Sequence, residues 1–168
     1  PQGVPEQEIA DWLAAGEVKN TKLPGGEWFK VEPGPMADSG EWTHQYGNAG
    51  NTTSSDEKLG GATQTDELEV QWVGRPGADF GIDRNPRMPA PLSSWGRLFH
   101  QGMNRMIALD AYNGSALWSL EIPDLRRVNM PRDASNWCTD GKALCVAVKD
   151  RCWEIDATNG HRKAAHSM

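Results

Sequence analysis

Three cysteines are the residues of this sequence best suited to chemistry, and they lie seven residues apart, at Cys138, Cys145 and Cys152. A structural zinc site needs close pairs such as C-x2–4-C, and this spacing does not match that pattern. His161 and His166 do not supply the missing pair. No metal site is therefore predicted. The odd count leaves at least one thiol unpaired, and the pattern favours small, buried, apolar thiols.

The other candidate groups lack the partners that catalysis requires. His44 and His100 have no serine or cysteine in a recognisable nucleophile motif, so hydrogen-bonded structural roles are predicted for both. The pair Arg126-Arg127 could bind a carboxylate or face solvent. A charged loop could line the entrance of a ligand-binding site or form local ion pairs in solvent. That loop contains Asp79, Asp83, Arg84 and Arg87. No catalytic residue is predicted.

The composition favours many short strands joined by turns. Of the 168 residues 38% are hydrophobic, and glycine and proline are plentiful, at 18 and 11. The net charge is −6 with no block of like charges, so nucleic acid is not an expected partner. No apolar run approaches the ~18–20 residues of a membrane span. The residues after Pro1 do not resemble a signal peptide, so either a leader has been removed or the chain begins inside a longer polypeptide, and we expect the second.

The first third of the chain divides into an N-terminal extension and a polar segment. The spacing of apolar residues predicts a helix over Glu6–Ala15, followed by short strands over 17–22 and 27–32 around a Pro-Gly-Gly turn. Pro33-Gly34-Pro35 indicates a boundary. We therefore predict an N-terminal helix and hairpin over 1–35 and a polar linker over 36–66, followed by a third region over 67–168. The aromatic residues of the linker suggest that it packs on that region.

Six segments in the remaining chain have the composition of strands. They are residues 68–74, 97–102, 105–110, 116–122, 143–149 and 151–156. An internal repeat organises them, because Leu98–Gly114 aligns without gaps onto Leu144–Gly160, 46 residues further on. A repeat of about 40–50 residues made of strands and turns is typical of β-propeller blades. The predicted fold class is therefore mostly β, with about two blades of a partial propeller.

The second repeat predicts a sheet with one face that is mostly large and apolar and another that carries small, uncharged residues. A turn at Lys149-Asp150 would pair Val148 with Arg151, Val146 with Trp153 and Leu144 with Ile155, and these six residues share one face. The opposite face carries the small residues Cys145, Ala147 and Cys152. Such a sheet belongs in a stack, with a neighbouring sheet on each face. Cys145 and Cys152 would be diagonal neighbours about 7–8 Å apart, too far for an easy disulfide.

The segment Leu109–Trp118, with the sequence LDAYNGSALW, resembles the repeat of quinoprotein-type propellers. That family includes pyrroloquinoline quinone (PQQ) alcohol dehydrogenases and outer-membrane assembly lipoproteins with similar blades. In its ALDAxTGxxxW run the chain turns from one strand into the next, and the tryptophan docks between blades. The residues that match this motif are Asp110, Asn113, Gly114, Trp118, Asp156, Asn159 and Gly160. The second copy has Ala164 where the tryptophan would fall. A preceding W…YG…NT segment and LxxxW strand extend the resemblance over about residues 41 to 160.

The resemblance implies a PQQ site only in part. Family members typically carry a glutamate in an E-x-T-P-L-like run, and here Met88 takes its place. They often carry an adjacent cysteine pair followed by an arginine; Arg132 could match that arginine and contact PQQ, but the cysteine pair is missing. The family's metal-binding carboxylate and catalytic aspartate would lie in later blades. The resemblance therefore supports the fold better than the chemistry.

Residues 1–35 allow two interpretations. A helix, a strand, a Pro-Gly-Gly turn and an EWFKVE strand look like the end of a class I methyltransferase domain. Alternatively, the segment is an N-terminal extension that clasps the propeller.

Three functional hypotheses follow from the sequence. The first is a non-catalytic propeller module, a scaffold or interaction domain of a periplasmic or cell-envelope protein. Its remaining blades would come from further chain or from other subunits. The second is a fragment of a PQQ-dependent alcohol or sugar dehydrogenase, and the third is the hinge between a methyltransferase domain and a propeller. In each of them Trp118 should be buried between consecutive blades.

Overall fold

The structure is a computed structural model that describes the backbone of residues 16–23, 26–33, 36, 38–74, 90–125 and 135–168. The chain divides into two compact units, Pro1–Ala37 and Asp38–Met168. In the first unit β1 (Gly16–Leu23) pairs antiparallel with β2 (Gly26–Pro33), with Leu23 opposite Gly26. The predicted hairpin is confirmed. The helix predicted over Glu6–Ala15 lies outside the described residues.

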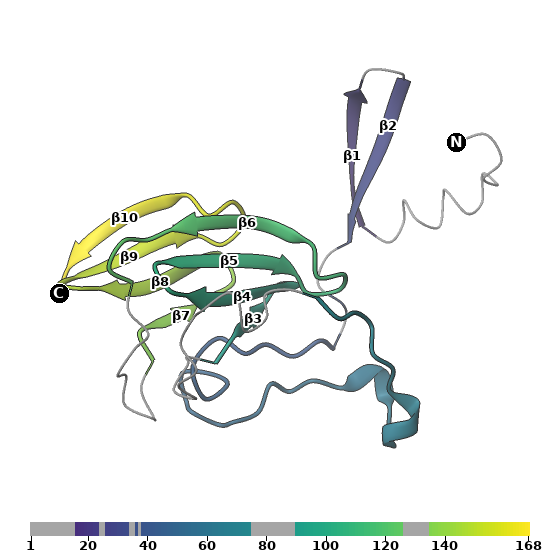
Figure 1. The fold of residues 1–168 in the computed structure, drawn as a ribbon. Coiled ribbons are helices and arrows are strands. Elements are labelled where there is room, and N and C mark those ends of the chain that lie inside the picture. Colours follow the sequence, from purple (N-terminus) through teal and green to yellow (C-terminus); the bar gives the residue numbers. More distant parts are fainter. Residues whose placement is uncertain (1–15, 24–25, 34–35, 37, 75–89, 126–134) are drawn as a thin grey trace. The chain divides into compact units, whose positions relative to one another are not determined.

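The second unit contains two four-stranded antiparallel sheets, and in each the strands follow one another in chain order (Figure 1). Blade 1 consists of β3 (Leu92–Ser94), β4 (Arg97–Gly102), β5 (Arg105–Asp110) and β6 (Ala116–Glu121). Blade 2 consists of β7 (Trp137–Thr139), β8 (Ala143–Val148), β9 (Arg151–Asp156) and β10 (Arg162–Ser167). Two consecutive four-stranded meanders confirm the predicted fold class, a mostly β chain with about two propeller-type blades.

The two blades have the same construction in detail. Each outer strand pairs with its neighbour through a register shift of one residue, at Ala108/Leu109 in blade 1 and at Arg162/Ala164 in blade 2. The β8–β9 register is the predicted one, with Val146 opposite Trp153. The repeat seen in the sequence is therefore a repeat of whole blades.

The strands predicted over 97–102, 105–110, 116–122, 143–149 and 151–156 are confirmed, to within one residue at their ends. The strand predicted over 68–74 is wrong for the described chain. It has no strand partner among the described residues. A strand requires a neighbouring strand to take its ladder of backbone hydrogen bonds, and neither sheet supplies one here.

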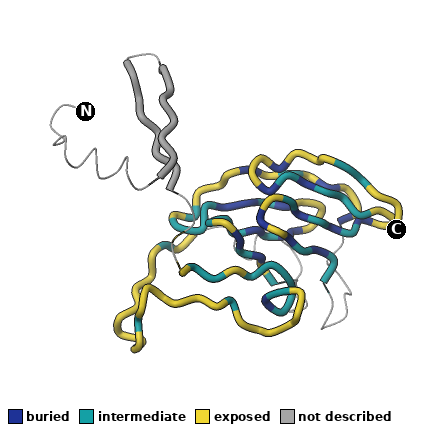
Figure 2. Tube along the Cα trace, turned by 180° about the vertical axis from the view of Figure 1, so that it is seen from behind, coloured by how far each residue is buried: buried dark blue, intermediate teal, exposed yellow. Residues whose placement is uncertain are grey.

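The hydrophobic core lies between the two blades. Figure 2 shows the buried residues gathered in the sheets, whereas residues 49–74 are mostly exposed. Blade 1 contributes Leu92, Phe99, Met106, Ala108 and Trp118, and blade 2 contributes Trp137, Leu144, Val146, Val148 and Ile155. These residues fall at every second position of their strands, so one face of each sheet meets one face of the other.

The polar segment 38–74 contains two short 3-10 helices, η1 (Leu59–Gly61) and η2 (Thr65–Glu67). Its first part lies along the inner edges of the blades. Trp42 forms an antiparallel bridge with Ser93 of β3, and Thr139 of β7 donates its backbone N–H to the carbonyl of Thr43 at 3.0 Å. The segment thereby covers backbone groups at the edge of both sheets and is fixed to the blades.

Candidate functional site: blade corners and the faces between blades

The Asp-Ala-x-Asn-Gly corner of blade 1 is held by its own side chains. The Oδ1 of Asp110 accepts hydrogen bonds from the backbone N–H groups of Tyr112 (2.8 Å) and Asn113 (3.2 Å). The Oδ1 of Asn113 accepts the N–H of Ser115 at 2.8 Å. Gly114 has a φ of 72°, in the left-handed region that glycine adopts without a steric penalty. Aspartate, asparagine and glycine are therefore each required by the shape of this turn.

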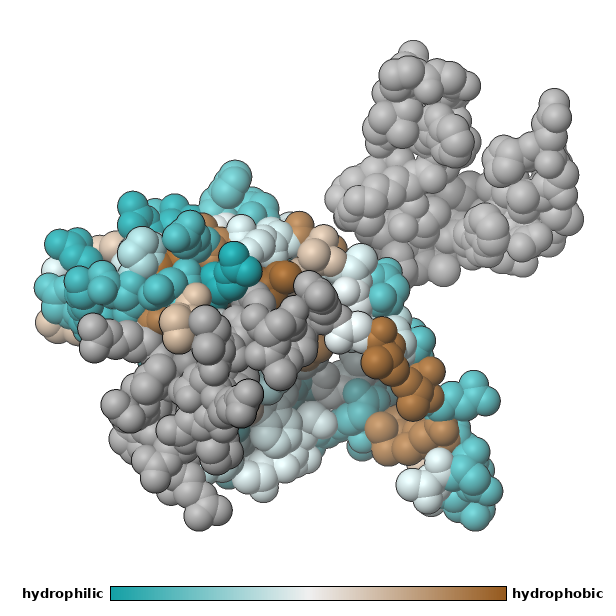
Figure 3. Space-filling model, in the orientation of Figure 1, coloured by the Kyte–Doolittle hydropathy of each residue, from teal (hydrophilic) through white to brown (hydrophobic). Residues whose placement is uncertain are grey.

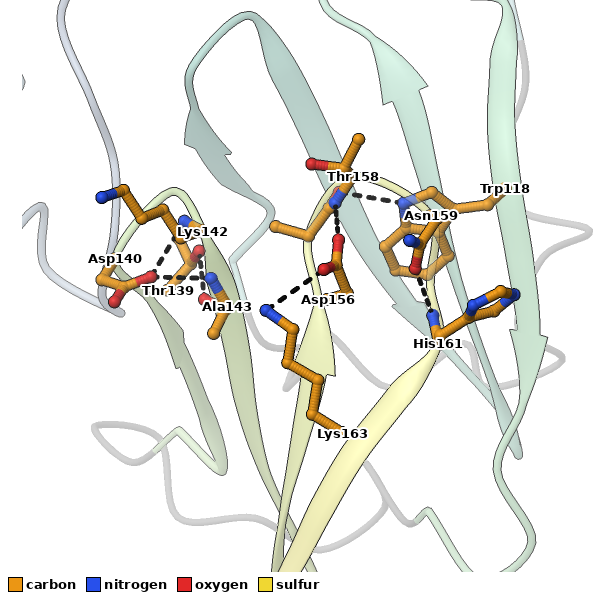
Figure 4. A network of polar contacts seen from close by, with 11 residues as sticks. Trp118, Thr139, Asp140, Lys142, Ala143, Asp156, Thr158, Asn159, His161 and Lys163 are labelled. Atoms are coloured by element: carbon orange, nitrogen blue, oxygen red, sulfur yellow. Dashed lines mark hydrogen bonds and ion pairs between the residues drawn. The ribbon is translucent and has the colours of Figure 1, made fainter.

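The corner of blade 2 repeats this geometry (Figure 4). The Oδ1 of Asp156 accepts the N–H of Thr158 at 2.8 Å, and the Oδ1 of Asn159 accepts the N–H of His161 at 2.8 Å. Lys163 adds an ion pair, with its Nζ 3.1 Å from Oδ2 of Asp156. The backbone N–H of Thr158, and then Lys163, lower the pKa of Asp156. The carboxylate is thus stabilised in its charged form.

A smaller turn between β7 and β8 is also held by an aspartate that accepts backbone N–H groups. The Oδ1 of Asp140 accepts the backbone N–H groups of Ala143 (2.7 Å) and Lys142 (2.9 Å), and these bonds lower the pKa of Asp140 (Figure 4). The hydroxyl of Thr139 donates to the carbonyl of Ala143 at 2.8 Å. The turns at this end of blade 2 are therefore fixed by local carboxylate and hydroxyl groups.

A tryptophan from the preceding repeat docks on each corner. Trp118 on β6 donates its indole N–H to the carbonyl of Ala157, at 3.0 Å, and its side chain is buried with 9% exposure. Its ring lies directly against Gly160, where a Cβ atom would stand 2.7 Å from the ring carbon Cε3. Gly160 is therefore needed both for its φ of 75° and for the close approach of the indole.

Trp72 makes the same contact one repeat earlier. Its indole N–H donates to the carbonyl of Ala111 at 2.9 Å, and a Cβ on Gly114 would lie 2.5 Å from its Cε3. Sequence reasoning noted Trp72 only as part of the LxxxW pattern, although its distance from Ala111 along the chain is the distance that separates Trp118 from Ala157. The tryptophan is not repeated a third time, because Ala164 occupies the position that follows Trp118 by one repeat length.

Each blade has one face that points away from the preceding repeat, and the residues on this face differ between the two blades. In blade 1 this face carries Leu92, Phe99 and Met106, which pack against blade 2 in the core. The residues one repeat later are the three cysteines. They belong to the distal face of blade 2, which consists of Cys138, Ala143, Cys145, Ala147, Cys152, Glu154, Ala164 and His166. No described residue of this chain forms a sheet over that face.

The thiols of the distal face are partly buried and free. Burial, followed by the neighbouring thiols Cys138 and Cys152, raises the pKa of Cys145 to about 11. Burial also raises the pKa of Cys138. A thiol with a raised pKa is a poor nucleophile at neutral pH, because the thiolate is the reactive form. The arrangement therefore favours packing over covalent chemistry.

The two histidines discussed above occupy different surroundings. The Nδ1 of His44 lies 2.9 Å from the hydroxyl oxygen of Thr43, within hydrogen-bonding distance. His100, on β4, is partly buried, and burial lowers its pKa. It shares a face with Leu98 and Ile107, and we call this the proximal face of blade 1. In blade 2 the equivalent residues Leu144 and Val146 are buried against blade 1.

Several predicted residues lie outside the described parts of the chain. They are Asp79, Asp83, Arg84, Arg87, Met88, Arg126, Arg127 and Arg132. The cofactor-binding prediction for Arg132 therefore stays a prediction. Among the described residues, no group of three His, Cys, Asp or Glu side chains is placed to hold a metal ion.

No protein-family model and no curated protein matches the chain. Two solved structures are similar over part of it. BamB from Moraxella catarrhalis is 19% identical with a TM-score of 0.33, over 43% of this chain and 20% of that one. A europium-containing methanol dehydrogenase is 17% identical with a TM-score of 0.35, over 46% of this chain and 15% of that one. The chain thus spans a fifth or less of either protein's length. The comparisons give no support to the methyltransferase resemblance of residues 1–35.

Within the described residues no helix has the length and apolar character needed to cross a membrane.

Proposed function

We propose that the chain is a non-catalytic part of a β-propeller and acts as a scaffold or interaction module within a larger protein or complex. The indole of Trp118 holds blade 1 against blade 2, and the corner carboxylates of Asp110 and Asp156 hold the turns on which the indoles dock. These contacts support a role in assembly.

One observation carries this proposal. The distal face of blade 2 is small and uncharged along its centre, at Ala143, Cys145 and Ala147, yet it is uncovered within the described chain. The equivalent face of blade 1 forms half of the core. Figure 3 shows hydrophobic side chains at the surface of this unit among hydrophilic ones. An uncovered stacking face with open strand edges favours association with another sheet.

The sequence resemblance to quinoprotein propellers supports a periplasmic or cell-envelope location for this module. Fractionation of cells that produce the natural protein tests this, and recovery in the cytosol alone contradicts it.

Size measurement in solution tests the proposed assembly. We expect the purified chain to associate with itself or with a partner, so light scattering should give a mass above 18.5 kDa. Ala147→Arg, on the distal face, should weaken the association. Thr158→Arg, on an exposed corner, is the matched control and should leave it unchanged. A stable, monodisperse monomer of 18.5 kDa would contradict the proposal.

A further inference from the structure

Trp95 is an exposed aromatic residue in a turn position that disfavours bulky side chains. It lies in the two-residue turn between β3 and β4, with a φ of 52°, and Gly96 follows with a φ of 69°. Turns with a positive φ at both positions favour Asn-Gly or Asp-Gly, and a bulky residue there costs free energy. The indole is nevertheless 51% exposed, so burial offsets little of this cost. A side chain kept in such a position at the surface points to a role in binding.

The surroundings of Trp95 hold its indole in place. The Oε1 of Glu41 accepts the backbone N–H of Trp95 at 3.2 Å and the hydroxyl of Ser94 at 2.9 Å. One edge of the indole lies against Gly141 in the β7–β8 turn, where a Cβ atom would stand 2.6 Å from the ring nitrogen Nε1. A ring that is fixed before a ligand arrives loses little side-chain entropy on binding.

Two carboxylates lie beside this indole. Glu41 is bonded to the backbone of Trp95, and Asp140 belongs to the β7–β8 turn that the indole touches. Both residues are exposed, and neither forms an ion pair with a described side chain. Hydrogen bonds from the backbone N–H of Ala143, and then of Lys142, lower the pKa of Asp140, so its carboxylate is charged at neutral pH. An exposed indole beside carboxylates attracts a cation.

We propose that Trp95, Glu41 and Asp140 form a docking site for an arginine side chain of a partner polypeptide. The guanidinium would stack on the indole and donate its N–H groups to the carboxylates, because it is planar, weakly hydrated and suited to both contacts. The same pairing occurs within the chain, where the Cζ of Arg162 lies 4.5 Å from the ring centroid of Trp153. The site shares no residue with the distal face of blade 2, so it does not depend on the association proposed there.

Charge complementarity selects this partner. The chain has a net charge of −6, and at this site the exposed side chain of Lys142 offsets only part of the negative charge of Glu41 and Asp140. An anionic ligand would be repelled. A neutral ligand such as a sugar could stack on the indole, but its binding would not depend on salt or on the charge of the carboxylates. The contribution of charge to binding therefore distinguishes the arginine partner from a neutral one.

A blocked tripeptide with a central arginine between two glycines is a defined probe for the site. The same tripeptide with citrulline has nearly the same shape without the charge and is its control. We expect the arginine peptide to bind the full chain with a Kd of about 1–10 mM in saturation-transfer NMR titrations at about 0.15 M salt. The citrulline peptide should bind about threefold more weakly or worse, and added salt should weaken only the arginine peptide.

Five variants locate the binding. Trp95→Asn removes the ring and places a residue that suits the turn, so the variant should fold like the parent and bind the arginine peptide about two- to fivefold more weakly. Glu41→Gln and Asp140→Asn keep the oxygen that accepts the backbone N–H groups but remove the charge, so each should weaken binding about twofold. Lys142→Gln removes a competing cation and should strengthen it. Glu121→Gln, an exposed charge at the other end of blade 1, is the matched control and should leave binding unchanged.

The outcomes separate this inference from the broader proposal. Equal binding of the arginine and citrulline peptides overturns it, as does unchanged binding in Trp95→Asn. An equal loss of affinity in Glu121→Gln and Glu41→Gln overturns it as well, because the peptide would then respond to overall charge. If binding weakens as the chain concentration rises, a second copy of the chain occupies the site and the partner named here is wrong. A monodisperse monomer that binds the arginine peptide leaves this site intact, whereas the proposed association through the distal face fails.

Discussion

Replacement of Trp118 by alanine should destabilise the second unit more than any other single change on β6. Its indole is 9% exposed, stacks against Gly160, and lies 6.1 Å from the ring of Phe99, centroid to centroid, at a tilt of 40°. Truncation of a buried Trp to Ala costs about 3–5 kcal/mol. The carbonyl of Ala157 also loses its donor, which costs about 1 kcal/mol or more. We expect a loss near the upper end of that range.

Two variants of the same strand separate packing from hydrogen bonding. Trp118→Phe keeps an aromatic ring but removes the indole N–H, so it should cost about 1–3 kcal/mol. Leu117→Ala changes the adjacent residue, which lies at the register shift and is 45% exposed. Its free energy of unfolding should stay within about 0.5 kcal/mol of that of the parent. Urea unfolding followed by far-UV circular dichroism measures each value without relying on tryptophan emission.

Gly160→Ala tests the close approach directly. Its Cβ would lie 2.7 Å from Cε3 of Trp118, and its φ of 75° alone costs a non-glycine residue about 1–2 kcal/mol. In the Trp118→Ala background the destabilisation caused by the steric clash should disappear, and only the destabilisation caused by the backbone conformation should remain. The two changes should therefore be non-additive. Strict additivity, or a Trp118→Ala variant as stable as the parent, would refute the docking argument.

Three further predictions concern charge and ligands. The pKa of Asp156 is lowered in the folded chain. The carboxylate therefore contributes to the free energy of unfolding above its unfolded pKa of about 3.9, and this contribution is lost as the pH falls below that value. Asp156→Asn should therefore flatten the loss of stability in acid titrations of the unfolding free energy, and Lys163→Gln should flatten it less; an unchanged slope in Asp156→Asn contradicts this. Cys145, with a pKa of about 11, should react slowly with iodoacetamide at pH 7.5 and faster in Cys138→Ser, since one neighbouring thiol is removed; fast labelling of the parent refutes the burial argument. Calorimetric titration with PQQ and calcium should show no micromolar binding, because one arginine pair supplies about 1 kcal/mol of the roughly 8 kcal/mol required; micromolar binding that is lost in Arg132→Ala would overturn this.

The sequence predicted the central strands of each blade because those strands carry the repeat. Residues 97–102 and 143–149 combine apolar side chains with a turn signal at each end, and a gapless alignment places them in register. The inner strands β3 and β7 have three residues each, too few for a period of two to emerge. The outer strand β10, Arg162–Ser167, is mostly exposed and polar, so its composition does not distinguish it from a loop.

Residues 68–74 show where local sequence reasoning ends. Alternating apolar residues predicted a strand there, but strand pairing depends on a neighbouring strand that no local pattern encodes. The docking of Trp72 was equally hidden, because an indole hydrogen bond to Ala111 joins residues 39 positions apart. A search for repeated pairs at that separation, rather than for repeated segments, would have found it.

The role of the cysteines could have been predicted more fully from the internal repeat than from their spacing. Their seven-residue spacing excluded a zinc pattern and pointed to small apolar side chains, but the repeat alignment also places Cys145 at the position of Phe99. Blade 1 fills the layer between blades with its own large side chains, and it fixes the next blade with Trp118. Blade 2 offers a thiol and Ala164 at those two positions, so a sheet that covers it must supply the volume and find another means of alignment. The two open sides of the chain therefore differ in kind. On the side at Trp72 an indole already docks on the corner of blade 1, whereas under the proposed function the distal face of blade 2 would pack against a partner whose side chains are larger than its own.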